Sequence, residues 1–109
     1  MIEKLEAILA NGQDSASLRF ALANGYFGQD DAVRAIEHAR VATELDPGYS
    51  AAWRLLGQAQ VSAGQESDAI ETFLRGIEVA KSKGDRQVEK EMRVFLKRAQ
   101  KTVGVTEPE

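Results

Sequence analysis

A spacing of 34 residues constrains the fold of this chain more than any other feature. When the sequence is shifted by 34 residues against itself, residues of similar size and polarity fall opposite one another. The pairs are Leu22 with Leu56, Ala23 with Gly57, Ala35 with Ala69, Ile36 with Ile70, and Ala42 with Gly76. A period between about 20 and 50 residues is typical of stacked repeats, in which each unit buries its apolar face against its neighbours.

Within the first period, the apolar residues recur at helical spacing. Leu18, Leu22 and Tyr26 follow one another every four residues and therefore share one face of a helix. A second apolar stripe runs through residues 32–45 and ends before Pro47, whose ring cannot continue the helical hydrogen-bond ladder. The period is therefore predicted to be two helices joined by a turn.

The second period repeats this pattern. One helix is predicted to begin at Ser50 and to end at Gly64, and the next runs from about Glu66 to Lys83. Gly84 suits the C-terminal cap of the latter helix. Candidate N-terminal caps of the two earlier helices are Asp14 or Ser15 and Asp30 or Asp31.

Small residues lie at the same place in both periods. Gly57 and its counterpart Ala23 have almost no side chain, so a second helix can approach closely there, with Ala69 offering a small facing surface. Trp53 and Leu56 are expected to fill the space alongside as core residues. Gly76 is expected to pack tightly against the helix that follows.

These residues carry a resemblance to a known family. The second period contains Trp53, Leu56-Gly57, Ala69 and Phe73, and Pro47 closes the period before it. This resembles the tetratricopeptide repeat, whose signature is W-x₂-L-G-x₂-Y, A-x₃-F and a closing Pro at a 34-residue period. The first period matches more loosely, because Arg19 takes the place of the Trp and Ala39 that of the Phe.

The resemblance implies an all-α fold, in which antiparallel helix-turn-helix repeats stack as a short right-handed superhelix of about six helices. Residues 1–101 are expected to form a single domain. It is divided into a half-repeat helix (1–12), repeat one (16–49), repeat two (50–83) and a C-terminal capping helix (85–101), followed by a flexible tail (102–109). The same shift sets Met1, Ile2, Leu5 and Ile8 at the apolar positions of the half-repeat helix.

The resemblance also implies a function. The first helices of such repeats line a concave groove, so the chain is expected to be a non-catalytic module that binds a peptide or protein segment there. The residues implied to line the groove are Ser17, Phe20, Asn24, Phe27, Ala51, Arg54, Gln58 and Val61. Phe20 and Phe27 are expected to be exposed, and the amides and Arg54 suit a peptide backbone or a carboxylate. Phe20 occupies a place where chaperone-binding relatives have Lys, which argues against that specialised clamp.

The last helix offers an alternative contact surface. Lys90, Lys97 and Lys101 cluster on the side opposite its apolar stripe, with Arg93 nearby, and this basic face suits an acidic partner. No aromatic residue lies among these bases to stack on a nucleotide, so nucleic acid is not expected. A further alternative is a structural adaptor whose stack ends associate weakly with another copy.

The composition excludes several other classes of protein. The chain has 109 residues, no cysteine and one histidine, His38, which has no nucleophile or carboxylate at catalytic spacing and is expected to serve packing or the surface. No catalytic residue, metal site or cofactor is therefore predicted. The N-terminus does not resemble a secretory signal and no apolar stretch is long enough to span a membrane, so a cytoplasmic location is expected.

Overall fold

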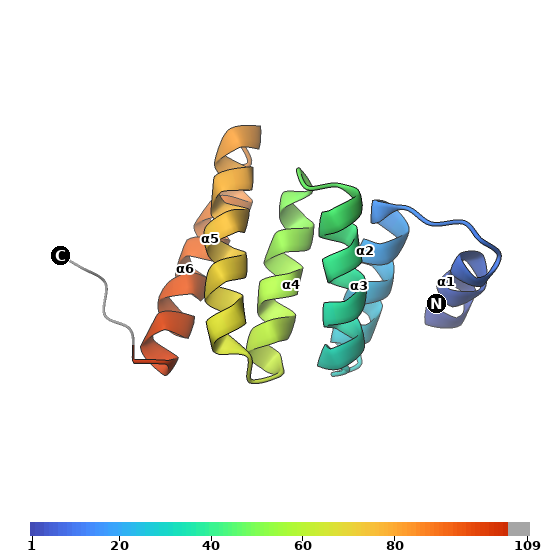
Figure 1. The fold of residues 1–109 in the computed structure, drawn as a ribbon, viewed down its shortest axis with the longest axis horizontal. Helices are drawn as coiled ribbons and strands as arrows, with labels where there is room; N and C mark the ends of the chain where they lie inside the picture. Colours follow the sequence, from blue (N-terminus) through green and yellow to red (C-terminus); the bar gives the residue numbers. More distant parts are fainter. Residues whose placement is uncertain (105–109) are drawn as a thin grey trace.

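The computed structural model describes residues 1–104, which form six α-helices and no β-strand. The helices are α1 (Ile2–Ala10), α2 (Ala16–Gly28), α3 (Ala32–Leu45), α4 (Ser50–Ser62), α5 (Glu66–Lys83) and α6 (Arg86–Thr102). They stand side by side along one axis, with α1 at one end and α5 and α6 at the other (Figure 1). The predicted all-α architecture of helix-turn-helix repeats is confirmed.

Side-chain and glycine caps fix where several helices begin and end. The Ser15 hydroxyl accepts a hydrogen bond from the Leu18 N–H at the start of α2 (3.0 Å), and the Asp31 carboxylate accepts one from the Arg34 N–H at the start of α3 (3.1 Å). Each bond satisfies an N–H that the helix itself leaves without a partner. Gly84 ends α5 with φ +72°, a left-handed conformation that favours glycine.

The first of two apolar clusters lies between α2, α3 and α4. Leu22, Ala23 and Ala35 are fully buried there, and Leu56 of α4 closes the cluster from the next repeat. Leu22 and Leu56, which match across the 34-residue period, therefore lie in the same cluster, as expected for repeats that bury their faces against one another.

The second cluster lies between α4, α5 and α6. Phe73 and Met92 are completely buried in it, and Trp53 joins it from α4. The indole Nε1–H of Trp53 donates a hydrogen bond to the carbonyl oxygen of Pro47 (2.9 Å), which satisfies its one polar group. Trp53 is thus a core residue, as predicted, and Met92 shows that α6 covers the end of the second repeat.

The close crossing predicted at Gly57 is present, and the ring of Phe73 is the nearest group to it. A β-carbon on Gly57 would overlap the ring of Phe73, with the ring Cζ only 2.5 Å away. Ala69, one turn earlier on α5, is also fully buried. The bulk of Phe73 fills the space that the missing side chain of Gly57 leaves open.

The expectation for α1 is wrong in part. Met1 and Ile8 are 84% and 39% exposed, whereas Ile2, Leu5 and Leu9 pack against the first cluster. The helix begins only at Ile2, after Met1, and a five-residue connection (11–15) joins it to α2. The register of the 34-residue period is therefore not imposed on this short helix, and it turns Leu9 rather than Ile8 toward the core.

At the other end of the chain, α6 includes Thr102. Of the segment expected to be a tail, residues 103–104 follow the helix as a turn. Residues 105–109 lie outside the described part of the chain.

Candidate functional site

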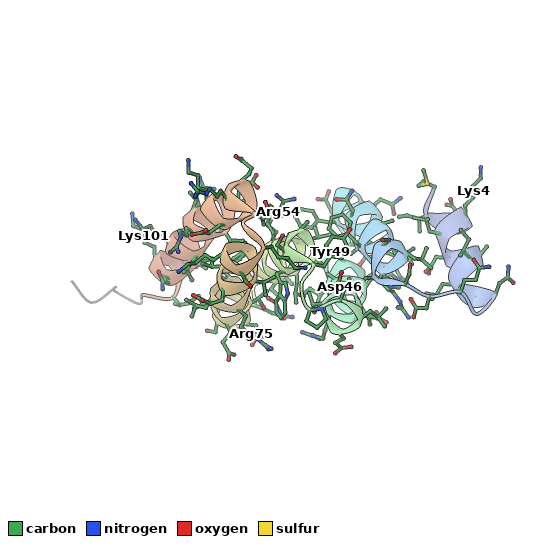
Figure 2. The ribbon with its side chains drawn as sticks, turned by 90° about the horizontal axis from the view of Figure 1, so that it is seen from above. Lys4, Asp46, Tyr49, Arg54, Arg75 and Lys101 are labelled. Atoms are coloured by element: carbon green, nitrogen blue, oxygen red, sulfur yellow. The ribbon has the colours of Figure 1, made fainter. Side chains whose placement is uncertain are left out.

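The helices form two faces of the stack. α2, α4 and α6 are neighbours on one face, while α3 and α5 cover the other. Seen from above, Arg54 of α4 and Arg75 of α5 lie on opposite sides of the stack (Figure 2). The face made by α2, α4 and α6 is the one on which the groove was predicted.

A cavity of about 350 Å³ opens on this face. We call it the concave cavity; its lining residues are Phe27, Gln58, Val61, Ser62, Phe73, Phe95, Arg98, Ala99 and Thr102. Three of them, Phe27, Gln58 and Val61, belong to the groove residues predicted from the sequence. Three aromatic rings and a single guanidinium give the cavity an apolar interior with one positive charge.

Four of the lining residues lie on α6 and were not predicted as groove residues. Phe95, Arg98, Ala99 and Thr102 recur at spacings of three to four residues, so they form one strip of that helix. Phe95 and Ala99 belong to the apolar stripe that the sequence predicted for this helix, and Arg98 lies at the border of that stripe. The sequence predicts α6 as a capping helix with a basic face, and in the structure it also supplies the third wall of the concave cavity.

The remaining predicted groove residues do not line this cavity. Ser17 and Asn24 are exposed on α2, and Ala51 is half-buried on α4. Phe20 is half-buried, packs against the first cluster and lies 5.1 Å from the ring of Tyr49. The expectation that Phe20 is a freely exposed aromatic is therefore wrong, because the α3–α4 connection covers it.

Phe27 differs from the expectation in a similar way. It is half-buried and packs against the first cluster while it also lines the cavity. Its ring therefore joins the core to the cavity wall, and substitution of Phe27 is expected to affect both stability and the cavity.

Arg54 already has an acidic partner within the chain. Its Nη1 donates to Oε1 of Glu91 on α6 at 2.6 Å, and both side chains are partly exposed. Hydrogen bonds between ionised groups at such distances are among the stronger ones in proteins. The guanidinium of Arg54 therefore ties α4 to α6, whereas Arg98 makes no ion pair with any residue in the range 1–104.

The predicted basic face lies on α6. Lys90, Arg93, Lys97 and Lys101 are all exposed, and Arg93 forms an ion pair with Glu89 one turn earlier (2.9 Å). None of the four lines the concave cavity. The basic face is therefore a separate surface.

His38 is buried in a polar network between α1, α2 and α3. Its Nδ1 lies 3.1 Å from Nη1 of Arg19, its ring stacks on Tyr26, and the Tyr26 hydroxyl donates to Glu6 of α1 (3.0 Å). Burial lowers the pKa of His38, and the positive charge of Arg19 lowers it further. The network holds α1 against the first repeat.

A larger cavity of about 500 Å³ lies on the opposite face, between α3, α4 and α5. Its lining includes the charged residues Arg40, Glu44, Asp68, Glu71 and Arg75. Trp53 also lines this larger cavity, but five charged side chains make its lining strongly polar, whereas Arg98 is the one charged residue that lines the concave cavity. Size alone therefore does not make this second cavity the better candidate.

Residues 1–104 contain no group of three or more His, Cys, Asp or Glu side chains placed to hold a metal ion. Over the same residues, none of the helices has both the length and the apolar character needed to cross a membrane.

The model of the family described as "Tetratricopeptide repeat" matches residues 26–86, which is more than half of the chain. The chain belongs to the tetratricopeptide repeat family. It is 49% identical over 98 residues to a TPR repeat-containing protein of Pseudomonas aeruginosa, a match that covers 90% of this chain and 93% of the relative.

Solved structures agree with this assignment. A protein from Bordetella parapertussis superposes with a TM-score of 0.80 at 39% identity, over 94% of this chain and 89% of that one. A tetratricopeptide repeat domain protein from Salinibacter ruber gives a TM-score of 0.77 at 27% identity, over 89% and 100% of the two chains. Tetratricopeptide repeat proteins are generally non-catalytic scaffolds that bind protein partners, and membership of the family supports a protein–protein interaction module in general.

Proposed function

We propose that this chain binds a segment of a partner protein in the concave cavity and catalyses no reaction. The observation that carries the proposal is the apolar cavity of about 350 Å³, which has aromatic walls and one guanidinium at its edge. Sites that bind small ligands or side chains typically have volumes from about 300 to 1,000 Å³ and combine apolar walls with a few polar groups. The cavity matches this description at the scale of one or two partner side chains.

The lining residues define the chemistry of the segment. An apolar side chain would pack between Phe27, Val61 and Phe95. The amide of Gln58 both donates and accepts hydrogen bonds, as a partner backbone requires. Arg98 would receive a carboxylate, a role that the sequence predicts for Arg54, whose guanidinium is paired with Glu91 in the structure.

The exposed side chains of Ser17 and Asn24 extend the same face along α2. We propose that they contact the part of the segment that lies outside the concave cavity. Arg54 and Phe20 would then support the site through the packing of α4 and α2, with little direct contact to the partner.

The experiment begins with peptides selected from a display library on the folded chain, with binding measured by fluorescence anisotropy. Val61 is 40% exposed in the cavity wall, so Val61→Glu should place a charge among the aromatic rings without opening the core. We expect this variant to weaken binding at least tenfold, or about 1.4 kcal/mol. Arg98→Glu should have a similar effect on peptides that carry an acidic residue.

Val33→Glu is the matched control. Val33 is 70% exposed on α3, on the opposite face, so the same substitution there should leave peptide binding unchanged. Circular dichroism must show that all variants remain folded. If Val61→Glu binds as well as the wild type while Lys97→Glu loses binding, the basic face of α6 is the site and the proposal is wrong.

A further inference from the structure

The outer face of α5 carries an exposed leucine between two carboxylates. Leu74 is 49% exposed, Glu71 lies one turn before it and Glu78 one turn after it, and both glutamates are exposed. Neither glutamate forms an ion pair with any residue in the described range 1–104. Leu74 therefore lies between two carboxylates on a face of α5 that also carries the exposed bases Arg75 and Lys81.

The outer face of α6 has the same pattern with the opposite charge. Val94 is 48% exposed, Lys90 lies one turn before it and Lys97 one turn after it, and both lysines are exposed. In the part of the chain that the structure describes, these lysines also make no ion pair. The two helices therefore carry complementary strips of equal length.

Contacts between α5 and α6 set the two strips at the same height. Phe73 meets Phe95, with ring centroids 5.8 Å apart. A second contact lies three residues after Phe73 on α5 and three residues before Phe95 on α6. There, a β-carbon on Gly76 would lie 2.6 Å from Sδ of Met92. Because α5 and α6 run antiparallel, each step toward the C-terminus of α5 pairs with a step toward the N-terminus of α6. Two residues paired in this way lie at the same height along the helix axes. The level pairs are Leu74 with Val94, Glu71 with Lys97, and Glu78 with Lys90.

A twofold axis parallel to the helices would use this register between two copies. Rotation about such an axis does not change the height of a residue along the helices. It places α5 of one copy against α6 of the other copy, and these two helices run antiparallel. The leucine of one copy then faces the valine of the other, and each glutamate faces a lysine. α5 and α6 lie together at the end of the stack, where no further helix of the described chain covers them (Figure 1).

We propose that two copies of this chain form a closed dimer through α5 and α6, with these six residues at the contact. The contact is isologous, so it ends at two copies rather than growing into a filament. None of the six residues lines the concave cavity, so this cavity stays open in each copy of the dimer, whereas Glu71 also lines the larger polar cavity. The inference is independent of the proposed function.

The size of the faces predicts a weak dimer. Helices of 17 and 18 residues are about 26 Å long and about 10 Å wide each, which gives roughly 500 Å² for each copy. An interface of about 1,000 Å² in total is at the low end for a specific association. Exposed ion pairs are screened by salt, so dimerisation should weaken as the ionic strength rises.

Sedimentation equilibrium over a range of concentrations at low salt tests the charge pairs. Lys97→Glu and Glu71→Lys should each raise the dissociation constant of the dimer at least tenfold, because each places like charges opposite one another twice. The variant with both substitutions exchanges the two charges and should return to within about threefold of the wild type. Lys4→Glu on α1 and Glu44→Lys on α3 are matched controls away from the contact, and they should not change the constant.

Cysteine cross-linking tests the register. The natural chain has no cysteine, so Leu74→Cys and Val94→Cys each introduce a single thiol. A mixture of the two variants should form a disulfide dimer on mild oxidation, whereas each variant alone should not, because the two copies of one position lie on different helices of the interface.

A chain that remains monomeric at millimolar concentration and low salt would overturn the proposal. So would a dimer that is indifferent to Lys97→Glu, or one that the double exchange does not restore. Equal cross-linking of Leu74→Cys alone and of the mixture would contradict the antiparallel register.

Discussion

Gly57→Ala should destabilise the protein, although alanine is the better helix former. The new β-carbon would overlap the ring of Phe73, 2.5 Å from its Cζ, and ordinary contacts begin at about 3.4 Å. Phe73 is fully buried against Phe95, so its ring has little room to move. Overpacking of this kind costs about 1–3 kcal/mol, while the replacement of glycine within a helix gains about 1 kcal/mol.

The net expectation is a loss of up to about 2 kcal/mol in the free energy of unfolding, measured by urea denaturation with circular dichroism. Gly28→Ala is the matched control, because a β-carbon at Gly28 in α2 would have no atom within 4 Å. That variant should be as stable as the wild type or slightly more so. If Gly57→Ala is as stable as Gly28→Ala, the close crossing of α4 and α5 is misplaced and so is the packing argument.

Two further predictions concern α3. Asp31→Ala removes the cap that accepts from the Arg34 N–H and should cost about 1 kcal/mol, whereas Asp31→Asn keeps an acceptor and should retain most of that stability; equal losses in the two variants would rule out the capping role. Because the pKa of His38 is lowered in the folded state, its contribution to stability is fully present above the ordinary value of 6.5 and is lost as pH falls below it. His38→Gln should therefore reduce the loss of stability between pH 7 and pH 5, and parallel stability curves for the two proteins would contradict the buried, neutral state of His38.

The repeats could be predicted from the sequence because their period and their residue sizes are governed by local packing. Leu22, Leu56 and Trp53 are large and apolar at helical spacing, and each is in the core. Gly57 could be recognised as a crossing point from its missing side chain. Its close contact with the ring of Phe73 depends on how far α5 is shifted along α4, and a periodic pattern does not determine that shift.

The errors occur where contacts join different units. The pairing of Arg54 with Glu91 connects α4 to a helix outside the 34-residue period, so the shift could not align the two residues. Phe20 is covered by Tyr49 from a connecting segment, which a helical pattern does not describe. Arg98 could not be predicted as a cavity residue from the sequence. α6 contains several bases, and their pattern does not distinguish a base that lines a cavity from one that faces solvent.

The cytoplasmic location stays a prediction from the sequence, as does the identity of the partner.

The most direct test of the proposed binding site is a chemical-shift map of the ¹⁵N-labelled chain titrated with a selected peptide. The account predicts that the largest shifts fall on residues around the concave cavity, including Phe27, Val61 and Arg98, with small changes on α3. Shifts concentrated instead around Arg40 and Glu44 would place binding in the polar cavity of the opposite face and contradict the proposed site.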